Sequence, residues 1–159
     1  MPMVLLGLGS NIGDKEEHIR KALTSLSNIC NIKLTSHLYL TEPVGNTEQD
    51  WFLNCVVKME TDVDPKKLLS SIKSIERNLG RTKTVKNGPR IIDIDILFYG
   101  DHIIKTKDLV IPHPLMQERL FVLRPMMDIN PDFVHPALKK SIHELYEEHT
   151  WTEKVILYK

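Results

Sequence analysis

Cysteine is scarce in this sequence of 159 residues, which contains only Cys30 and Cys55. The two form no CxxC pair, and no cluster of histidines lies beside either of them. The CxxC patterns of zinc sites and of disulfide-exchange enzymes are therefore excluded. We expect both residues to be reduced thiols with a structural role in a cytosolic protein.

An excess of charge of one sign is also lacking, because 21 Lys and Arg residues balance 21 Asp and Glu residues. No basic run stands out, which argues against a general nucleic-acid binder. No apolar run approaches the ~18 residues that a membrane-spanning helix needs. Residues 1–7 lack the basic segment of a signal peptide and lead directly into a strand-like run. We therefore expect a cytoplasmic protein whose partners include neither nucleic acid nor a membrane.

The composition is that of an ordinary globular protein, with 42% hydrophobic and 26% charged residues. A chain of this length suits one domain with a full core and is too short for two. We predict a single domain over residues 1–159, and we expect it to act as a monomer.

Hydrophobic periodicity and turn residues predict strands that alternate with helices. The expected strands are residues 3–9, 32–40, 51–60 and 88–99, and the expected helices are residues 14–28 and 64–79. Asp14 and Asp64 stand where each helix needs an N-cap. This βαββαβ order is typical of a ferredoxin-like α/β (α+β) fold, in which both helices pack on one face of an antiparallel sheet. The other face then stays open for an active site.

Shorter secondary-structure elements are predicted for the C-terminal third of the chain. A hairpin is expected over residues 102–111 and a helix over residues 116–127, broken at Pro125. Ser141 is expected to cap a short helix over residues 143–149. Residues 155–158 complete the prediction as a last short strand.

The stretch Gly88-Pro-Arg-Ile-Ile-Asp-Ile-Asp-Ile-Leu-Phe-Tyr99 organises the rest of the chain. In a strand, side chains alternate between the two faces of the sheet. One face would then be apolar, formed by Ile92, Ile94, Ile96 and Phe98. The other face would carry Asp93 and Asp95 side by side, roughly 7 Å apart at two residues of rise.

Two adjacent carboxylates repel each other unless a cation neutralises them. An all-oxygen site of this kind suits Mg²⁺, which is usually held by one or two carboxylates together with substrate phosphates. Arg90 just before them suits a substrate whose negative charge exceeds that of the metal, as in a polyphosphate. The alternative is that Asp93 and Asp95 are two solvated acids on the open face of a sheet.

Two loops and one glycine-rich turn are further candidates for function. Residues 41–50 form a long connection, and such loops tend to be functional. Residues 81–87 are basic and form either a solvated linker or a mobile loop that grips anions, and their place before the carboxylate strand favours the second interpretation. Gly7 and Gly9 suggest a dinucleotide-binding turn, but the next glycine comes one residue late for GxGxxG and no acid ends a second strand about 20 residues on.

Three segments together resemble the 6-hydroxymethyl-7,8-dihydropterin pyrophosphokinases of folate biosynthesis. They are Leu-Gly-Leu-Gly-Ser-Asn at 6–11, Gly-Pro-Arg followed by Asp-Ile-Asp-Ile-Leu within 88–97, and Ile-Pro-His-Pro followed by Glu-Arg-Leu-Phe-Val-Leu-Arg-Pro within 111–125. The resemblance implies a ferredoxin-like fold. It also implies transfer of the β,γ-pyrophosphoryl group of ATP, the co-substrate, to the hydroxymethyl oxygen of the dihydropterin, with release of AMP.

The resemblance further implies roles for individual residues. Asp93 and Asp95 would hold two Mg²⁺ ions, and Arg81, Arg90 and the two aspartates would form the catalytic group. ATP would be bound by Lys73, Glu76, Lys83, Arg90, Ile96, His113, Pro114 and Arg119. The pterin would be bound by Thr41, Glu42, Val44, Phe52, Asn54 and Phe121. Phe52 and Phe121 would sandwich the flat ring, and Asn54 would read its hydrogen-bonding edge.

The sequence departs from the family pattern at several positions. Asn87 stands where a tryptophan is expected before Gly-Pro-Arg, and the basic loop is one residue shorter. Asp108 and Val110 replace an arginine and a threonine, and Lys73 aligns with a glutamine. Two other functions are compatible with the same scaffold: a Mg²⁺-dependent phosphotransferase with a different acceptor, and a non-catalytic module that binds a ligand on its open sheet face.

Overall fold

An antiparallel sheet forms the middle layer of the protein, whose computed structural model describes residues 1–45, 47–81 and 88–159. Its strands are β1 (Met3–Ser10), β2 (Asn31–Thr35), β3 (Tyr39–Thr41), β4 (Phe52–Glu60), β5 (Asp93–Tyr99) and β8 (Val155–Leu157). Their order is β5-β1-β4-β3-β8, with β2 also paired to β4. A separate hairpin joins β6 (Ile104–Lys105) to β7 (Val110–Ile111), as expected.

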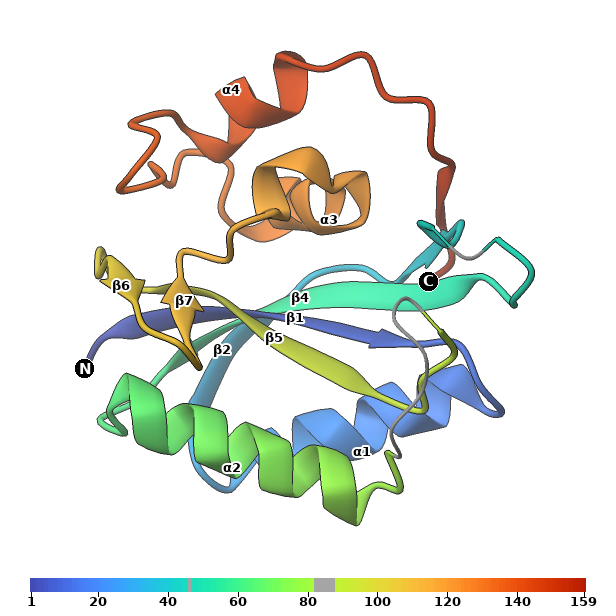
Figure 1. Cartoon of the computed structure of the whole chain (residues 1–159), viewed down its shortest axis with the longest axis horizontal. Coiled ribbons are helices and arrows are strands. Elements are labelled where there is room, and N and C mark those ends of the chain that lie inside the picture. Colours follow the sequence, from blue (N-terminus) through green and yellow to red (C-terminus); the bar gives the residue numbers. More distant parts are fainter. Residues whose placement is uncertain (46, 82–87) are drawn as a thin grey trace.

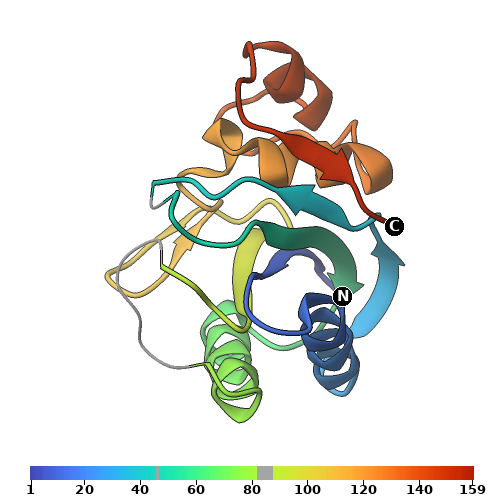
Figure 2. The same cartoon turned by 90° about the vertical axis from the view of Figure 1, so that its right-hand side faces the viewer.

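Helices cover both faces of this sheet (Figures 1 and 2). On one face lie α1 (Lys15–Ser27) and α2 (Pro65–Asn78). On the other face lie α3 (Leu120–Ile129), which follows the short 3₁₀ turn η1 (Met116–Glu118), and then α4 (Ile142–Glu147). None of the helices in the described part of the chain has the length and apolar character needed to cross a bilayer.

The predicted ferredoxin-like fold is confirmed by this topology. The order β1, α1, β2 with β3, β4, α2, β5 places β5 and β4 on either side of β1, with α1 and α2 on one face. The expected strand 32–40 forms two pieces, because the Ser36 hydroxyl bonds the amide of Val56 in place of a regular ladder. The second face is only partly open, since α3 and α4 pack over one part of it.

Two hydrophobic clusters lie on the two sides of the sheet. The cluster beneath α1 and α2 includes Val4, Leu6 and Leu8 of β1. The cluster beneath α3 and α4 includes Leu5 of the same strand, because alternate side chains point to opposite faces. Burial of apolar surface on both sides is what ties the two helical layers to one sheet.

A bulge in β5 changes the predicted faces of that strand. Leu5 pairs with Phe98 and Leu6 pairs with Ile96, so Leu97 is an extra residue in the ladder. The predicted apolar face is therefore wrong at Phe98, which points to the α3 side and contacts the Phe133 ring edge-on at 4.7 Å between centroids. Strand β5 also begins at Asp93 rather than at residue 88.

Pro125 does not break the helix that contains it. Helix α3 runs unbroken from Leu120 to Ile129, and the interruption in the expected helix falls at Arg119, whose backbone is extended between η1 and α3. A proline in a helix removes one hydrogen bond, and the buried face of α3, which includes Leu123 and Met126, offsets that loss. The predicted cap at Ser141 is confirmed as a capping box with Glu144.

Candidate functional site

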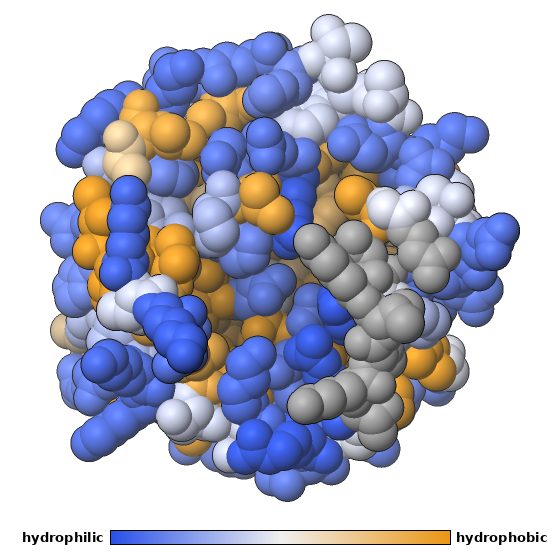
Figure 3. Space-filling view, viewed as in Figure 1, coloured by the Kyte–Doolittle hydropathy of each residue, from blue (hydrophilic) through white to orange (hydrophobic). Residues whose placement is uncertain are grey.

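A pocket with about 780 Å³ of empty space, its open mouth included, lies on the sheet face that α3 leaves uncovered. Figure 3 shows hydrophilic side chains gathered over the C-terminal end of α2, below this region. Ten of the predicted site residues line the pocket: Thr41, Glu42, Val44, Phe52, Asn54, Arg90, Asp93, Asp95, Arg119 and Phe121. Segments from β1, β3, β4, β5 and the start of α3 thus converge on one cavity.

Both aspartates of β5 face this pocket, as the alternation of the strand predicts. In the ladder with β1, Asp93 lies opposite Gly9 and Asp95 lies opposite Gly7. Because glycine has no side chain, Gly7 leaves the sheet surface open beside Asp95, and Gly9 leaves the space that the side chain of Asn54 fills. The arrangement leaves room for a ligand directly against Asp95.

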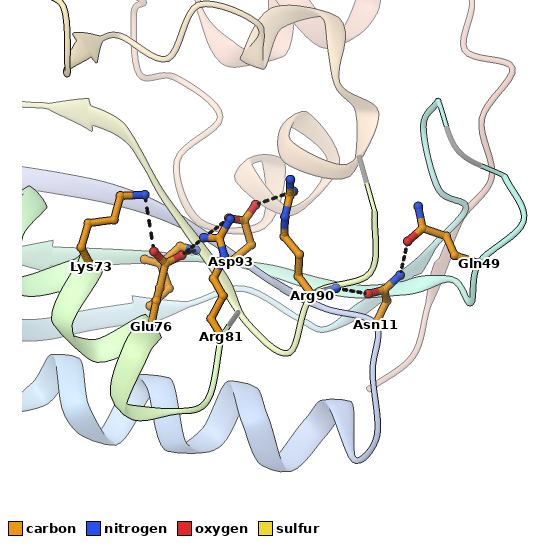
Figure 4. A network of polar contacts seen from close by, with 8 residues as sticks. Asn11, Gln49, Lys73, Glu76, Arg81, Arg90 and Asp93 are labelled. Atoms are coloured by element: carbon orange, nitrogen blue, oxygen red, sulfur yellow. Dashed lines mark hydrogen bonds and ion pairs between the residues drawn. The ribbon is translucent and has the colours of Figure 1, made fainter. Parts of the chain in front are cut away.

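A chain of ion pairs holds Asp93 in place (Figure 4). The Arg81 guanidinium donates to Glu76 Oε2 at 2.5 Å and to Asp93 Oδ1 at 3.0 Å. Glu76 is only 2% exposed, accepts a hydrogen bond from the amide of Ile94 at 2.9 Å, and pairs with Lys73 at 3.5 Å. The catalytic and ATP-binding candidates on α2 and β5 therefore form one network.

Arg90 is fixed by its backbone as well as by its charge. Its guanidinium lies 3.7 Å from Asp93 Oδ2, and its amide donates to the Asn11 side chain at 2.8 Å. The amide group of Asn11 also donates to Gln49 Oε1 and to the carbonyl oxygen of Asp50. One buried asparagine thus connects the end of β1, the long loop and the segment that carries Arg90 (Figure 4).

The carboxyl of Asp95 lacks sufficient neutralising charge. Burial, followed by repulsion from Asp93, raises the pKa of Asp95 to about 7. The charge of Arg119 opposes that rise in pKa. Arg119 also stacks over the Phe121 ring, with its Cζ 5.5 Å from the ring centroid. It therefore lies between the charged and the aromatic ends of the pocket.

The two aspartates fit a site for Mg²⁺. Two carboxylates of this kind are the hard oxygen ligands that the ion prefers. A bound cation would also counter the two causes that raise the pKa of Asp95, which are burial first and repulsion from Asp93 second. No group of three or more His, Cys, Asp or Glu residues in the described ranges could hold a metal. Phosphate oxygens and water would therefore supply the remaining coordination positions.

His113 is neutral at physiological pH. Burial, together with the charge of Arg119, lowers its pKa to about 4. Its Nδ1 accepts a hydrogen bond from the amide of Leu115 at 3.2 Å, so the proton of the neutral ring is on Nε2. The backbone amide of His113 bonds Leu97, which places this segment beside β5. His113 can therefore donate a hydrogen bond to a ligand.

The remaining predicted ATP-binding residues are placed less directly. Pro114 is exposed, and its carbonyl oxygen accepts a hydrogen bond from Gln117. The side chain of Ile96 packs in the core beneath α1 and α2, so a contact with ATP would have to use its backbone. Lys83 and Asn87, with the rest of the predicted basic loop from residue 82 on, lie outside the described residues.

The other end of the pocket combines aromatic rings with a buried amide. Asn54 is 8% exposed, and its side-chain amide donates to the Thr41 hydroxyl at 2.7 Å. A Cβ atom on Gly9 would lie 2.4 Å from Asn54 Oδ1. Phe52, on β4, and Phe121, in the first turn of α3, both line the cavity. This end suits a flat ring with a polar edge.

Two residues of this site, Gly9 and Asn11, were assigned no role from the sequence. Gly9 leaves the space that Asn54 occupies, and Asn11 orders Arg90. Both belong to the segment 6–11, in which Gly9 lies within the buried strand β1 and Asn11 directly follows it. Their roles depend on partners that are more than 40 residues away in the sequence for Gly9 and more than 75 for Asn11, which local pattern does not reveal.

The raised pKa of Asp95 predicts how stability depends on pH in metal-free buffer with EDTA. The ordinary carboxyl pKa is 3.8, so between pH 4 and about pH 7 the folded chain holds a proton that the unfolded chain has lost. The contribution of Asp95 to the free energy of unfolding should therefore fall as pH rises through this window. In chemical denaturation, Asp95→Asn should gain stability relative to the wild type from pH 4 to pH 7.

Asp132→Asn, which removes an exposed carboxylate after α3, is the control for the loss of one negative charge. Parallel stability curves for the wild type and Asp95→Asn between pH 4 and pH 7 would contradict this account of Asp95.

Comparisons with known proteins point to one enzyme family. A family model for 7,8-dihydro-6-hydroxymethylpterin-pyrophosphokinase (HPPK) matches residues 5–131. The 2-amino-4-hydroxy-6-hydroxymethyldihydropteridine pyrophosphokinase of Aquifex aeolicus is 42% identical over 150 residues, which cover 94% of each protein. The folic acid synthesis protein FOL1 of Dictyostelium discoideum is 52% identical over 136 residues, but these cover 86% of this chain and only 21% of FOL1.

Solved structures show the same fold. A crystal structure of wild-type Plasmodium falciparum HPPK-DHPS superposes with a TM-score of 0.74 at 21% sequence identity, covering 92% of this chain and 44% of that one. The chain thus spans less than half of that protein and about a fifth of FOL1. Since the family model covers most of the sequence and the Aquifex aeolicus enzyme matches over 94% of both proteins, the chain belongs to the 7,8-dihydro-6-hydroxymethylpterin-pyrophosphokinase family.

Proposed function

We propose that the chain transfers the pyrophosphoryl group of ATP to 6-hydroxymethyl-7,8-dihydropterin, a step of folate biosynthesis. The hydroxymethyl oxygen bonds to the β-phosphorus, the bond from that phosphorus to the oxygen bridging the α-phosphorus breaks, and AMP leaves with that oxygen. The hydroxyl proton passes to water. One observation carries the proposal: the aromatic and amide end and the carboxylate and arginine end belong to a single pocket.

At the charged end, Asp93 and Asp95 would hold two Mg²⁺ ions together with the triphosphate of ATP. Bound Mg²⁺ would neutralise phosphate charge and lower the pKa of the attacking hydroxyl. Arg90 and Arg119 line the same pocket as the aspartates, where each guanidinium can pair with phosphate oxygens. The role of the chain in such a transfer is to position the groups and to stabilise developing charge.

Residues of α2 and of the segment around His113 complete the ATP site, and the network that includes Glu76 sets the position of Asp93. Glu76 orients Arg81 and accepts the amide of Ile94, while Lys73 adds a positive charge at the edge of the site. His113, with Pro114 beside it, offers a neutral hydrogen-bond donor to the nucleotide. Lys83 and the backbone of Ile96 complete the proposed ATP site.

At the other end, Phe52 and Phe121 bind the two faces of the pterin ring. Asn54 offers both a donor and an acceptor to the polar edge of that ring, and its orientation is set by Thr41. Glu42 and Val44 close this end from the long loop. The carboxylate of Glu42 is itself held by the amide of Lys154, which keeps the start of the loop beside β8.

The cellular compartment, the domain organisation and the oligomeric state are also part of the proposal. Cys30 and Cys55 are both free and buried, which supports a reducing compartment such as the cytoplasm. The two hydrophobic clusters pack on opposite faces of one sheet, which supports a single domain over residues 1–159. We propose that this domain acts as a monomer, which sedimentation would measure.

The products of ATP turnover test the reaction directly. The protein is mixed with ATP, Mg²⁺ and 6-hydroxymethyl-7,8-dihydropterin, and the nucleotides are separated by chromatography. We expect AMP only when the pterin is present. Asp95→Ala should reduce the rate on the order of a thousandfold, because metal ions contribute several kcal/mol to such transfers.

Asp132→Ala, at an exposed position away from the pocket, should leave the rate unchanged. ADP in place of AMP would indicate ordinary γ-phosphoryl transfer and would contradict the proposal. Turnover of ATP with another hydroxyl acceptor but not with the pterin would point to a different phosphotransferase. Binding without any turnover of either substrate would favour a non-catalytic module.

Substitution of Gly9 should affect the pterin end more than the phosphate end. In Gly9→Ala the new Cβ would overlap Asn54 Oδ1, so Asn54 must move and its hydrogen bond to Thr41 is lost. We expect the KM for the pterin to rise roughly tenfold, in line with about 1–2 kcal/mol for a lost buried hydrogen bond. The KM for ATP should change less than twofold. Gly7→Ala is the control, because its Cβ would meet Leu97 only at 3.6 Å; an equal pterin effect in both variants would refute the role given to Gly9.

A further inference from the structure

A second group of polar contacts joins α3 to β3 outside the pocket. The hydroxyl of Tyr39 donates to Asp128 Oδ2 at 2.7 Å, and the amide of His37 donates to the same oxygen at 3.3 Å. Asp128 Oδ1 accepts a hydrogen bond from Arg124 at 3.2 Å, and the Arg124 guanidinium lies over the Tyr39 ring at 5.3 Å. Tyr39 is 2% exposed, and none of these residues lines the pocket. The function described above gives this cluster no role.

The cluster lies two residues along β3 and two helical turns along α3 from the aromatic end of the pocket. On β3, Tyr39 and Thr41 are two residues apart and share a face. On α3, Phe121 and Asp128 are seven residues apart, two turns of the helix, and also share a face. Tyr39 is therefore the neighbour of Thr41 on one face of β3, and Asp128 lies on the same face of α3 as Phe121. Thr41 and Phe121 both line the pocket.

Strand pairing also places Tyr39 on the same sheet face as the β4 residues at the pterin end of the pocket. Tyr39 lies directly opposite Asn54 and Thr41 lies directly opposite Phe52 in the ladder of β3 with β4. Directly opposed residues point to the same face of a sheet. Two neighbouring cross-strand pairs on that face thus contain Tyr39 and three residues that line the pocket.

Apolar packing alone does not fix α3 along its axis. Leu123 and Met126 bury the helix against the sheet, but burial of apolar surface has no directional preference. Hydrogen bonds to a carboxylate are short and directional, and they are about twice as strong as neutral ones. The contact of Asp128 with Tyr39 and with the amide of His37 is therefore suited to fix the rotation and the axial position of α3 relative to β3.

We propose that Tyr39 and Asp128 are positioning residues that set the placement of Phe121 over the pterin ring. The proposal rests on the function proposed above. A stacked ring tolerates little displacement of its partner. A shift of α3 at Asp128 would therefore displace the Phe121 ring relative to the pterin. The raised pKa of Tyr39, about 12 and due first to burial, is consistent with a hydroxyl that remains a donor to Asp128.

A double-mutant cycle between Tyr39 and Phe121 tests this role. The dissociation constant of 6-hydroxymethyl-7,8-dihydropterin is measured by calorimetry with Mg²⁺ and α,β-methylene-ATP for the wild type, Tyr39→Phe, Phe121→Ala and the double variant. We expect Tyr39→Phe to weaken pterin binding about fivefold to tenfold in the wild type and less than twofold when Phe121 is absent. The KM for ATP should stay within twofold.

Tyr99→Phe is the matched control. Its hydroxyl is also held, donating to the carbonyl oxygen of Val63 at 2.6 Å, but its ring packs in the cluster beneath α1 and α2. It should lower the melting temperature about as much as Tyr39→Phe while leaving pterin binding within twofold. If Tyr39→Phe does not fold, Asp128→Asn, which keeps the size of the side chain, takes its place in the cycle.

The outcomes separate this proposal from the proposed function. A wild type that binds and converts the pterin, together with equal losses from Tyr39→Phe in both backgrounds, would overturn the positioning role alone. The same conclusion would follow if Tyr39→Phe bound the pterin like Tyr99→Phe. A wild type that failed to bind the pterin would overturn the proposed function and this inference with it.

Discussion

The burial of the Asp95 carboxyl beside the charge of Asp93 is the constraint on which the site depends. Two carboxylates on one face of a strand, with the pKa of Asp95 raised to about 7, require cations around them. Arg81 and Arg90 supply positive charge to Asp93, and buried Glu76 holds Arg81 in place. The contact of Arg81 with Asp93 is the arrangement expected of a counter-ion that a metal can replace. In the proposed reaction, Asp93 would exchange these arginines for a metal ion that also binds phosphate.

The same cavity has a charged end at the two aspartates and an aromatic end at Phe52 and Phe121. Glycines of β1 lie opposite both aspartates, where Gly7 leaves the sheet surface clear and Gly9 leaves room for Asn54. The bulge at Leu97 turns Phe98 into the cluster below α3, which anchors that helix over one part of the sheet. The start of α3 then brings Arg119 to the charged end and Phe121 to the aromatic end. The same helix thus serves both substrates of the proposed reaction.

The order of elements and the shared face of the two aspartates could be predicted because they depend on local rules. Period-two alternation placed Asp93 and Asp95 together, and the caps at Asp14, Asp64 and Ser141 follow from side-chain chemistry. The bulge was missed because an extra residue in a ladder is set by the partner strand. The unbroken helix at Pro125 was missed because tertiary packing outweighs one lost hydrogen bond. The contacts of Gly9 and of Asn11 join distant segments and leave no local signature.

The decisive experiment for this carboxylate pair is a crystal structure with Mg²⁺, α,β-methylene-ATP and 6-hydroxymethyl-7,8-dihydropterin. We expect carboxylate oxygens of both Asp93 and Asp95 at about 2.1 Å from metal ions that also bind the phosphates. We also expect that Arg81 no longer contacts Asp93. Metal bound elsewhere, with Arg81 still paired to Asp93, would contradict the assignment of this carboxylate pair as the centre of the site.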